Sequence, residues 1–174
     1  MNFNDKANSV PNDDKPMIEN KLPPAMVTIA QRIEQFLSDQ LGESPRINHV
    51  LVNQYQAGEG IMAHSDGPAY APIVSTITTG SGQVLRLFDP ADRNRPLARV
   101  YLEPGALNVL YGQSYSQLLH EIEPLSADHI DTTLANFGLL SPHIVNRRVE
   151  RTKRVSFTFR QVKNSIKRPK FIKF

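Results

Sequence analysis

Apolar residues recur at helical spacing in one early segment of the chain and at strand spacing in most of the later segments. The helical spacing predicts one amphipathic helix over residues 25–41, ended by Gly42. Short alternating or apolar runs predict β-strands at residues 50–55, 74–79, 84–88, 100–102, 107–111, 118–122 and 154–162. Because Gly and Pro turns separate these many short strands, the pattern predicts a mainly β domain with a flanking helix, a sandwich or jelly roll.

The other stretches divide the chain into a domain and two tails. Residues 1–21 are rich in Asn, Asp, Lys and Pro without an apolar centre, which predicts a disordered polar tail rather than a secretory signal. Residues 22–162 are the one predicted domain, and residues 163–174 are a basic C-terminal tail. Inside the domain the periodicity fades over residues 123–146, which predicts a long loop with one short helical turn near residues 132–137.

The modest net charge of +3 conceals an uneven distribution. Residues 147–174 contain eleven Lys or Arg and one acidic residue, whereas residues 1–146 contain nine and sixteen. Phe171 and Phe174 lie among the tail's basic residues, which are Lys163, Lys167, Arg168, Lys170 and Lys173. Such a tail can bind phosphates and stack on unpaired bases, so single-stranded nucleic acid is one expected partner. A solvated tail without a partner explains the same composition.

The amino-acid composition limits the expected cellular location and excludes several kinds of catalytic chemistry. The 174 residues include no cysteine, which excludes disulfides, zinc-thiolate sites and thiol catalysis. No apolar run approaches membrane-spanning length, so we expect no membrane partner and a cytoplasmic or nuclear location. The sequence contains no His-Glu-x-x-His helix, phosphate-binding Gly loop or Gly-x-Ser-x-Gly elbow.

The most informative chemical feature is His64-Ser65-Asp66, followed much later by His120 in an apolar run. If the segment is a strand, His64 and Asp66 share a face and Ser65 points away. Two imidazoles and one carboxylate form a three-point face for Fe(II) that leaves open positions on the metal. The alternative explanation for His-x-Asp is surface turn polarity.

Three other histidines could replace His120 as the third ligand. His49 precedes a predicted strand, His129 lies in an acidic segment, and His143 lies in the predicted loop. His120 is preferred because its apolar neighbours predict a backbone held in a sheet, whereas the other segments are expected to be mobile.

A strand from Arg154 to Arg160 alternates strictly between polar and apolar residues. One face carries Arg154, Ser156, Thr158 and Arg160, and the other is apolar. Because arginine binds carboxylates bidentately, the polar face suits a pocket for a dicarboxylate. The alternative is an amphipathic strand whose basic face is solvated.

Asn53 and Tyr55 share a face of the strand predicted at residues 50–55. An amide and a phenol there could donate hydrogen bonds beside a metal, or Tyr55 could simply be half-buried packing.

In their order and spacing, Asn53-x-Tyr55, His64-x-Asp66, His120 and the Arg154 strand resemble the AlkB family of iron and 2-oxoglutarate dioxygenases. The resemblance covers about residues 22–160 and is greatest to the AlkB homologue six branch. It implies a double-stranded β-helix, the cupin-like jelly roll, with Fe(II) bound by His64, Asp66 and His120. It also implies that Arg154 clamps the distal carboxylate of 2-oxoglutarate with help from Asn53 and Tyr55. Arg160 would lie near the other end of that cosubstrate, and Ser156 stands where several relatives have Asn.

The resemblance implies an enzyme that uses Fe(II), 2-oxoglutarate and dioxygen to hydroxylate a C–H bond, with succinate and CO2 as coproducts. Hydroxylation of an N-methyl group leads to demethylation, and methylated nucleic acid is the first expected substrate. A protein or small-molecule substrate is the alternative. A non-catalytic metal-binding or nucleic-acid-binding jelly roll remains open as a different class of function.

Overall fold

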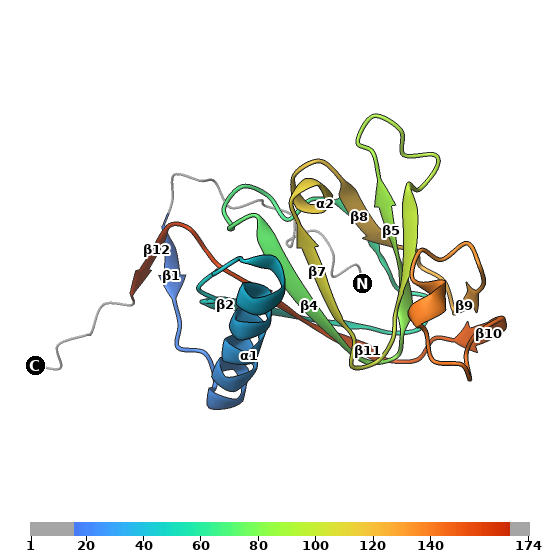
Figure 1. Cartoon of the computed structure of the whole chain (residues 1–174), viewed down its shortest axis with the longest axis horizontal. Coiled ribbons are helices and arrows are strands. Elements are labelled where there is room, and N and C mark those ends of the chain that lie inside the picture. The colour runs from blue at the N-terminus through green and yellow to red at the C-terminus, as the bar shows by residue number, and fades with distance from the viewer. Residues whose placement is uncertain (1–15, 168–174) are drawn as a thin grey trace, which may run out of the picture. The chain divides into compact units, whose positions relative to one another are not determined.

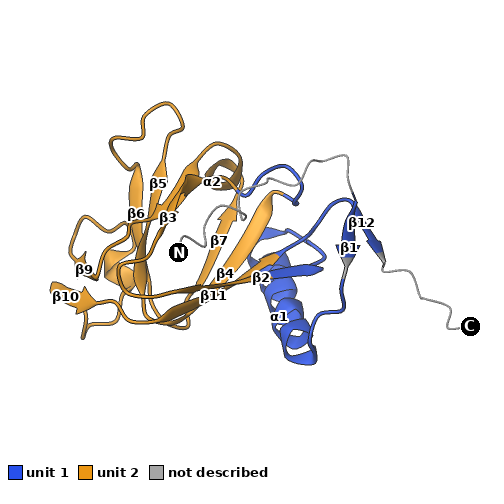
Figure 2. Ribbon diagram, turned by 180° about the vertical axis from the view of Figure 1, so that it is seen from behind, with its two compact units in different colours: residues 1–50, 66–71, 160–174 blue, residues 51–65, 72–159 orange. Residues whose placement is uncertain are grey.

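The computed structural model describes residues 16–167, and these divide into two compact units (Figure 2). Of the described residues, the first unit comprises residues 16–50, 66–71 and 160–167, and the second comprises Leu51–Ser65 and Pro72–Phe159. The second unit contains most of the β-structure.

The long helix of the first unit is α1 (Pro24–Leu41), as the apolar spacing predicts. Its buried residues are Ala30, Ile33 and Leu37, which have the i, i+3, i+7 spacing of one helix face. Gly42 ends the helix in the left-handed region at φ 69°; its N–H donates to the Ser38 carbonyl, and the N–H of Glu43 donates to the Leu37 carbonyl. Within residues 16–167, no helix has both the length and the apolar character needed to cross a bilayer.

The second unit is built mainly on two four-stranded sheets (Figure 1). The first sheet has the order β2-β11-β4-β7, with β2 (His49–Tyr55), β11 (Arg154–Arg160), β4 (Ile73–Gly80) and β7 (Leu107–Tyr111). The second has the order β3-β8-β5-β6, with β3 (Ile61–His64), β8 (Leu119–Ile122), β5 (Gln83–Phe88) and β6 (Ala98–Leu102). A four-residue helix, α2 (Gln113–Ser116), follows β7. The two sheets of antiparallel pairs confirm the predicted mainly β, double-stranded β-helix class.

One face of the first sheet carries buried polar residues. In the antiparallel pairing of β11 with β4, Ser156 lies opposite Thr78 and Thr158 lies opposite Thr76. Ser156, Thr158 and Thr78 are all buried, although they are polar. The face opposite to these residues carries the apolar positions of β11, as the alternation predicts. Part of this polar face is satisfied within the sheet, since Thr76 Oγ1 donates to Thr158 Oγ1 at 3.2 Å.

The two faces of the second sheet pack differently. Val84 and Tyr101 pack in a cluster with Ile130, Leu134 and Leu140, which come from the segment after β8. Leu85 on the other face packs in a separate cluster with Ile122 and Leu102. The segment after β8 therefore covers one face of this sheet and leaves the other face to line the interior of the sandwich.

The prediction of a long loop over residues 123–146 is wrong in part. This segment contains the strand β9 (Ala127–Ile130) and the 3-10 helix η1 (Phe137–Leu139). β9 pairs with β10 (Arg147–Glu150), which follows the segment. The strand was hidden because its buried alternate positions are Asp128 and Ile130, and a buried carboxylate breaks the hydrophobic pattern.

The two predicted tails also contain structure. β1 (Met17–Glu19) pairs in parallel with β12 (Ser165–Lys167) in the first unit. The expectation of disorder is therefore wrong at residues 17–19, and β12 lies within the predicted basic tail. Strands of three residues with a partner at the opposite end of the chain leave no periodic signal. The disorder predicted for residues 1–15 lies outside the described residues.

Candidate active site

His64 and His120 lie side by side in the second unit. They are directly opposite each other on β3 and β8, and their ring centroids are 4.3 Å apart. The pairing contains a register irregularity, since three positions separate Ile61 from His64 while their partners Ile122 and His120 are two apart. The extra residue is a β-bulge, and it puts His64 on the same face as His120.

A backbone hydrogen bond fixes the tautomer of His64. Its Nδ1 lies 2.8 Å from the carbonyl oxygen of Met62. A carbonyl can only accept, so Nδ1 carries the proton and the lone pair is on Nε2. Histidines that bind metals are commonly oriented in this way, with one ring nitrogen donating to a carbonyl and the other directed at the ion.

Asp66 is not on the strand, so the strand-alternation argument for it is wrong. β3 ends at His64, and residues 65–67 lie outside any strand, with Gly67 at φ 86°. Pro68 follows, and proline cannot donate to a strand ladder. In the first unit the carboxylate of Asp66 forms an ion pair with Arg160 and is nearly fully buried. Arg160 in turn lies over the ring of Tyr70, with 4.7 Å from its guanidinium carbon to the ring centroid.

Neither unit by itself holds a complete set of three ligands. Among residues 16–167, no group of three or more His, Asp or Glu side chains is placed to hold a metal ion. His64 and His120 belong to the second unit, and Asp66 belongs to the first. The assignment of Asp66 as a ligand therefore stays a prediction from the sequence.

The alternative histidines have other environments. His129 and His143 are exposed, on β9 and in the segment before β10. His49 lies in the first unit with its ring centroid 5.8 Å from that of Tyr70. Burial and the nearby charge of Arg160 lower the pKa of His49.

Arg154 is a buried cation without a carboxylate partner among the described residues. Only 4% of its surface is exposed, its Nη2 donates to Thr78 Oγ1 at 3.1 Å, and its Nε has no hydrogen-bond partner. Burial lowers the pKa of Arg154, although a guanidinium keeps its charge at neutral pH. An unpaired buried charge is costly, so this side chain suits an anionic ligand with planar oxygens.

Tyr55 completes the surroundings of Arg154. The Arg154 guanidinium carbon lies 5.5 Å from the centroid of the Tyr55 ring. Leu51, Asn53 and Tyr55 are the more buried alternate positions of β2, and Val52 and Gln54 between them are exposed. The shared face predicted for Asn53 and Tyr55 is confirmed by this alternation. Ser156 is buried on the Arg154 face of β11.

The backbone directly before β11 is fixed by hydrogen bonds from residues that the sequence pattern did not single out. Arg151 makes a buried two-bonded ion pair with Asp128, through Nε at 2.6 Å and Nη2 at 2.7 Å, and also donates to the Glu123 carbonyl. Ser81 accepts from the Thr152 N–H and donates its own N–H to the Lys153 carbonyl. These bonds fix the backbone immediately before Arg154. No local signal marks Arg151 and Asp128, because their partnership depends on the unpredicted hairpin of β9 and β10.

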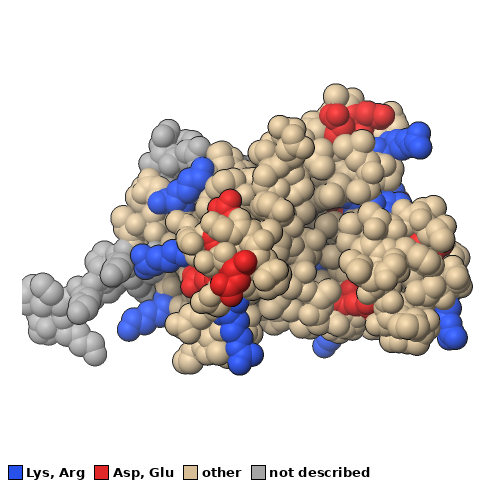
Figure 3. Space-filling model, viewed as in Figure 1, with Lys and Arg blue, Asp and Glu red and all other residues tan. Residues whose placement is uncertain are grey.

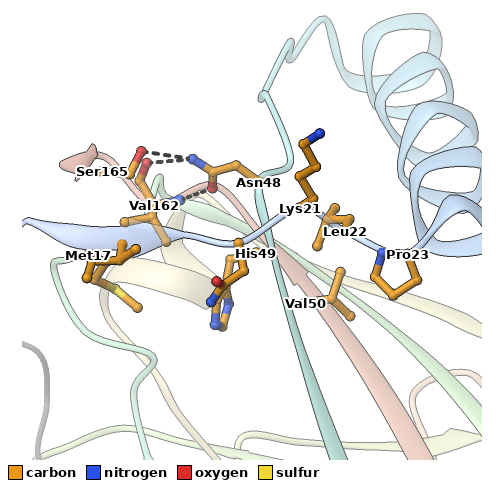
Figure 4. A pocket seen from close by; sticks show the side chains of 11 residues that line it. Met17, Lys21, Leu22, Pro23, Asn48, His49, Val50, Val162 and Ser165 are labelled. Carbon is orange, nitrogen blue, oxygen red and sulfur yellow. Dashed lines mark hydrogen bonds between the residues drawn. The ribbon is translucent and has the colours of Figure 1, made fainter. Parts of the chain in front are cut away.

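A separate pocket lies in the first unit, with a volume of ≈ 280 Å³ (Figure 4). The segment before α1, the start of β2 and residues near β12 line it. Asn48 joins the start of β2 to the chain near β12, because it accepts from the Val162 N–H and donates to the Val162 carbonyl and to Ser165 Oγ, as the dashed lines show. None of the residues predicted to hold iron or 2-oxoglutarate lines this pocket.

Basic and acidic side chains are interspersed on the face drawn in Figure 3 and do not merge into one basic patch there. Lys163 is exposed. Residues 168–174 and the Lys167 side chain, which include most of the predicted nucleic-acid contacts, lie outside the described part of the chain.

Two adjacent histidines on one sheet of a double-stranded β-helix, together with a buried arginine that has no carboxylate partner among the described residues, suit one class of non-haem iron enzyme. The family model described as 2OG-Fe(II) oxygenase superfamily matches residues 4–160, and the chain belongs to this superfamily of oxidoreductases. Its AlkB-like character follows from one relative, the Danio rerio protein named "Probable RNA/DNA demethylase ALKBH6". The two are 32% identical over 168 residues, which cover 91% of this chain and 70% of that protein.

Two further similarities are more distant. "Uncharacterized protein L905" of Acanthamoeba polyphaga mimivirus is 25% identical over 149 residues, covering 83% of this chain and 60% of that protein. The solved structure of OsALKBH1 has a TM-score of 0.54 and 20% identity, covering 81% of this chain and 65% of that one. The chain thus spans less than two thirds of both these proteins, and the structural likeness supports the fold.

The family implies Fe(II) and 2-oxoglutarate, and residues of the second unit suit the cosubstrate and two of the three iron ligands. His64 and His120 supply adjacent imidazoles, and the proton on Nδ1 of His64 leaves Nε2 as its metal-binding atom. Arg154 supplies a buried guanidinium whose Nε has no partner, as a carboxylate pocket requires. The residues present therefore suit the cofactor and the cosubstrate.

Proposed function

We propose that this protein is an Fe(II)- and 2-oxoglutarate-dependent oxidative demethylase or hydroxylase that acts on methylated nucleic acid. The observation that carries the cosubstrate assignment is Arg154, a buried guanidinium with an unpartnered Nε and no carboxylate beside it among the described residues. The printed name of the Danio rerio relative, a probable RNA/DNA demethylase, supports the substrate class.

In this proposal the chain supplies binding and orientation. His64, His120 and the sequence-predicted ligand Asp66 hold Fe(II), and the Met62 carbonyl keeps the His64 ring in its metal-binding tautomer. Arg154 binds the distal carboxylate of 2-oxoglutarate. Tyr55 packs against the guanidinium and Thr78 accepts one of its N–H groups, which together limit its movement. Asn53 and Ser156 are further cosubstrate contacts, and Arg160 lies near the opposite end.

Iron with 2-oxoglutarate and dioxygen supplies the oxidation, in which the cosubstrate becomes succinate and CO2 and one oxygen atom enters a substrate C–H bond. On an N-methyl group the product is a hemiaminal, which releases formaldehyde and leaves the demethylated nitrogen. On another carbon the product is a stable alcohol. The polar face of β11 holds the cosubstrate, and the apolar neighbours of His120 on the second sheet limit the access of water.

The test is incubation of the protein with Fe(II), ascorbate and 2-oxoglutarate under air, together with methylated oligonucleotides or cellular peptides. Mass spectrometry should detect a loss of 14 mass units, about one methylene, from an oligonucleotide, with formaldehyde and succinate formed in proportion. If only a peptide is modified, the substrate is a protein and not nucleic acid. Absence of succinate formation with every substrate would favour a non-catalytic binding module.

A further inference from the structure

Gln83 is a buried amide whose two polar atoms both lack a partner. Its exposed fraction is 0%, and neither Nε2 nor Oε1 has a hydrogen-bond partner. An amide buried in this way is destabilising, and a leucine of similar size would not carry that cost. Unsatisfied groups of this kind in a folded protein call for a ligand or an ordered water.

The Gln83 side chain lies on the face of the second sheet that carries His120. Gln83, Leu85 and Leu87 alternate along β5, and Leu87 is directly opposite His120 on β8. Val84 belongs to the other face, which the segment after β8 covers. The amide is therefore directed to the interior of the sandwich, with the imidazoles, rather than into the cluster around Val84.

Gln83 lies at the start of β5, at the same end of the sandwich as Arg154, the first residue of β11. Gly80 is directly opposite Arg154 on β4, and Gly80-Ser81-Gly82 leads straight into Gln83 at the start of β5. The Ser81 hydroxyl accepts from the Thr152 N–H, and the Ser81 N–H donates to the Lys153 carbonyl. These two bonds hold the turn against the backbone that leads into β11. Two buried and incompletely bonded polar side chains, Gln83 and Arg154, therefore occupy the same end of the interior.

We infer that Gln83 is a further cosubstrate contact, whose amide N–H donates to the distal carboxylate of 2-oxoglutarate beside Arg154. This inference rests on the proposed function. A carboxylate has about four lone-pair positions, and a guanidinium that also bonds Thr78 cannot fill all of them. A neutral amide adds a donor without a second buried charge, which would be costly beside Arg154.

The experiment measures binding by calorimetry, without oxygen, to protein loaded with Mn(II) in place of Fe(II). The ligands are 2-oxoglutarate and 2-oxopentanoate, which has a methyl group where 2-oxoglutarate has its distal carboxylate. Gln83→Leu should weaken 2-oxoglutarate binding roughly tenfold or more and leave 2-oxopentanoate binding unchanged. Its melting temperature without ligand should equal or exceed that of the unmodified protein, because an unsatisfied amide is removed.

The matched control is Ser75→Ala. Ser75 is also buried with an unpartnered hydroxyl, but it lies opposite Phe159 on the apolar face of the first sheet. This variant should bind both ligands as the unmodified protein does. Equal 2-oxoglutarate affinity in Gln83→Leu, or an equal loss for both ligands, would overturn the inference and leave an ordered water as the partner of Gln83. If the unmodified protein does not bind 2-oxoglutarate, the proposed function itself fails.

Discussion

Ile61 and His64 face the same side of β3 although three positions separate them. Their partners on β8 are Ile122 and His120, which are two positions apart and so share a face. The bulge between them re-aims His64 at His120, as bulges next to functional sites often do. Without it, a regular strand anchored at Ile61 would turn His64 to the opposite face of the sheet.

The iron site can be tested one ligand at a time. His64→Ala, Asp66→Ala and His120→Ala should each weaken Fe(II) binding by more than the roughly 10- to 100-fold that loss of an outer-shell partner costs. Their combined effects should be non-additive, because the ligands act as a unit. Anaerobic iron titration provides the measurement, with the exposed His129→Ala and His143→Ala as controls. Full iron affinity in the His120 variant would exclude this ligand set.

Substitution of Arg154 should separate the cosubstrate from the metal. Arg154→Lys keeps the charge but loses the planar fork, so 2-oxoglutarate binding should weaken while Fe(II) affinity is nearly unchanged. Arg154→Ala should cost more, about 1.5–3 kcal/mol of binding free energy. The control is Arg148→Lys, at an exposed ion pair with Glu150. Unchanged 2-oxoglutarate affinity in both Arg154 variants, measured by calorimetry, would argue against a dicarboxylate pocket.

The buried pair of Arg151 and Asp128 should dominate the stability of the β9 and β10 hairpin. Their side chains are 1% and 3% exposed. Asp128→Ala leaves a buried guanidinium without its carboxylate, so the free energy of unfolding should fall by about 3–5 kcal/mol. Glu150→Ala removes the partner of exposed Arg148 and should cost about 0–1 kcal/mol. Urea denaturation of both variants makes the comparison, and equal losses would contradict the role given to burial.

Two glycines distinguish backbone strain from steric contact. Gly58 and Gly80 have φ of 82° and 78°, but a Cβ on Gly58 would meet nothing within 4 Å, whereas one on Gly80 would lie 2.4 Å from the Lys153 carbonyl oxygen. Gly58→Ala should cost about 1–2 kcal/mol of stability from the left-handed backbone alone. Gly80→Ala should cost about 2–5 kcal/mol, because the contact adds to the strain. Gly80→Ala should also weaken 2-oxoglutarate binding, because the added methyl group would displace the backbone of Lys153, which directly precedes Arg154.

The C-terminal end should contribute to nucleic-acid binding through charge. Deletion of residues 168–174 leaves β12 in place and removes Arg168, Lys170 and Lys173. The affinity for single-stranded oligonucleotides should fall, and the slope of its logarithm against log salt should decrease by about 2. Phe171→Ala and Phe174→Ala should lower affinity with little change in slope. Identical binding by the full and shortened chains across a salt series would identify the tail as a solvated appendage.

The sequence by itself determined the elements whose signal is local. The apolar spacing and Gly42 define α1, and the runs that became β2, β4, β5, β6, β7, β8 and β11 are visible because each buries one face or both. The alternation from Arg154 to Arg160 separated its polar face before any partner strand was known. The order and spacing of Asn53-x-Tyr55, His64-x-Asp66, His120 and the Arg154 strand carried the resemblance to the family.

Only the tertiary structure decided which residues lie together when the partners are distant or the local pattern is broken. The bulge before His64 depends on the register of β8, and β9 depends on a carboxylate that is buried only because Arg151 pairs with it. Gln83 directly precedes the strand predicted at residues 84–88, and its burial without a hydrogen-bond partner follows from the sheets that enclose it. Hydrophobic periodicity within a segment indicates which of its faces are exposed to water. Strand register and the burial of single polar residues depend on contacts between segments that are distant in the sequence, and these contacts position the site.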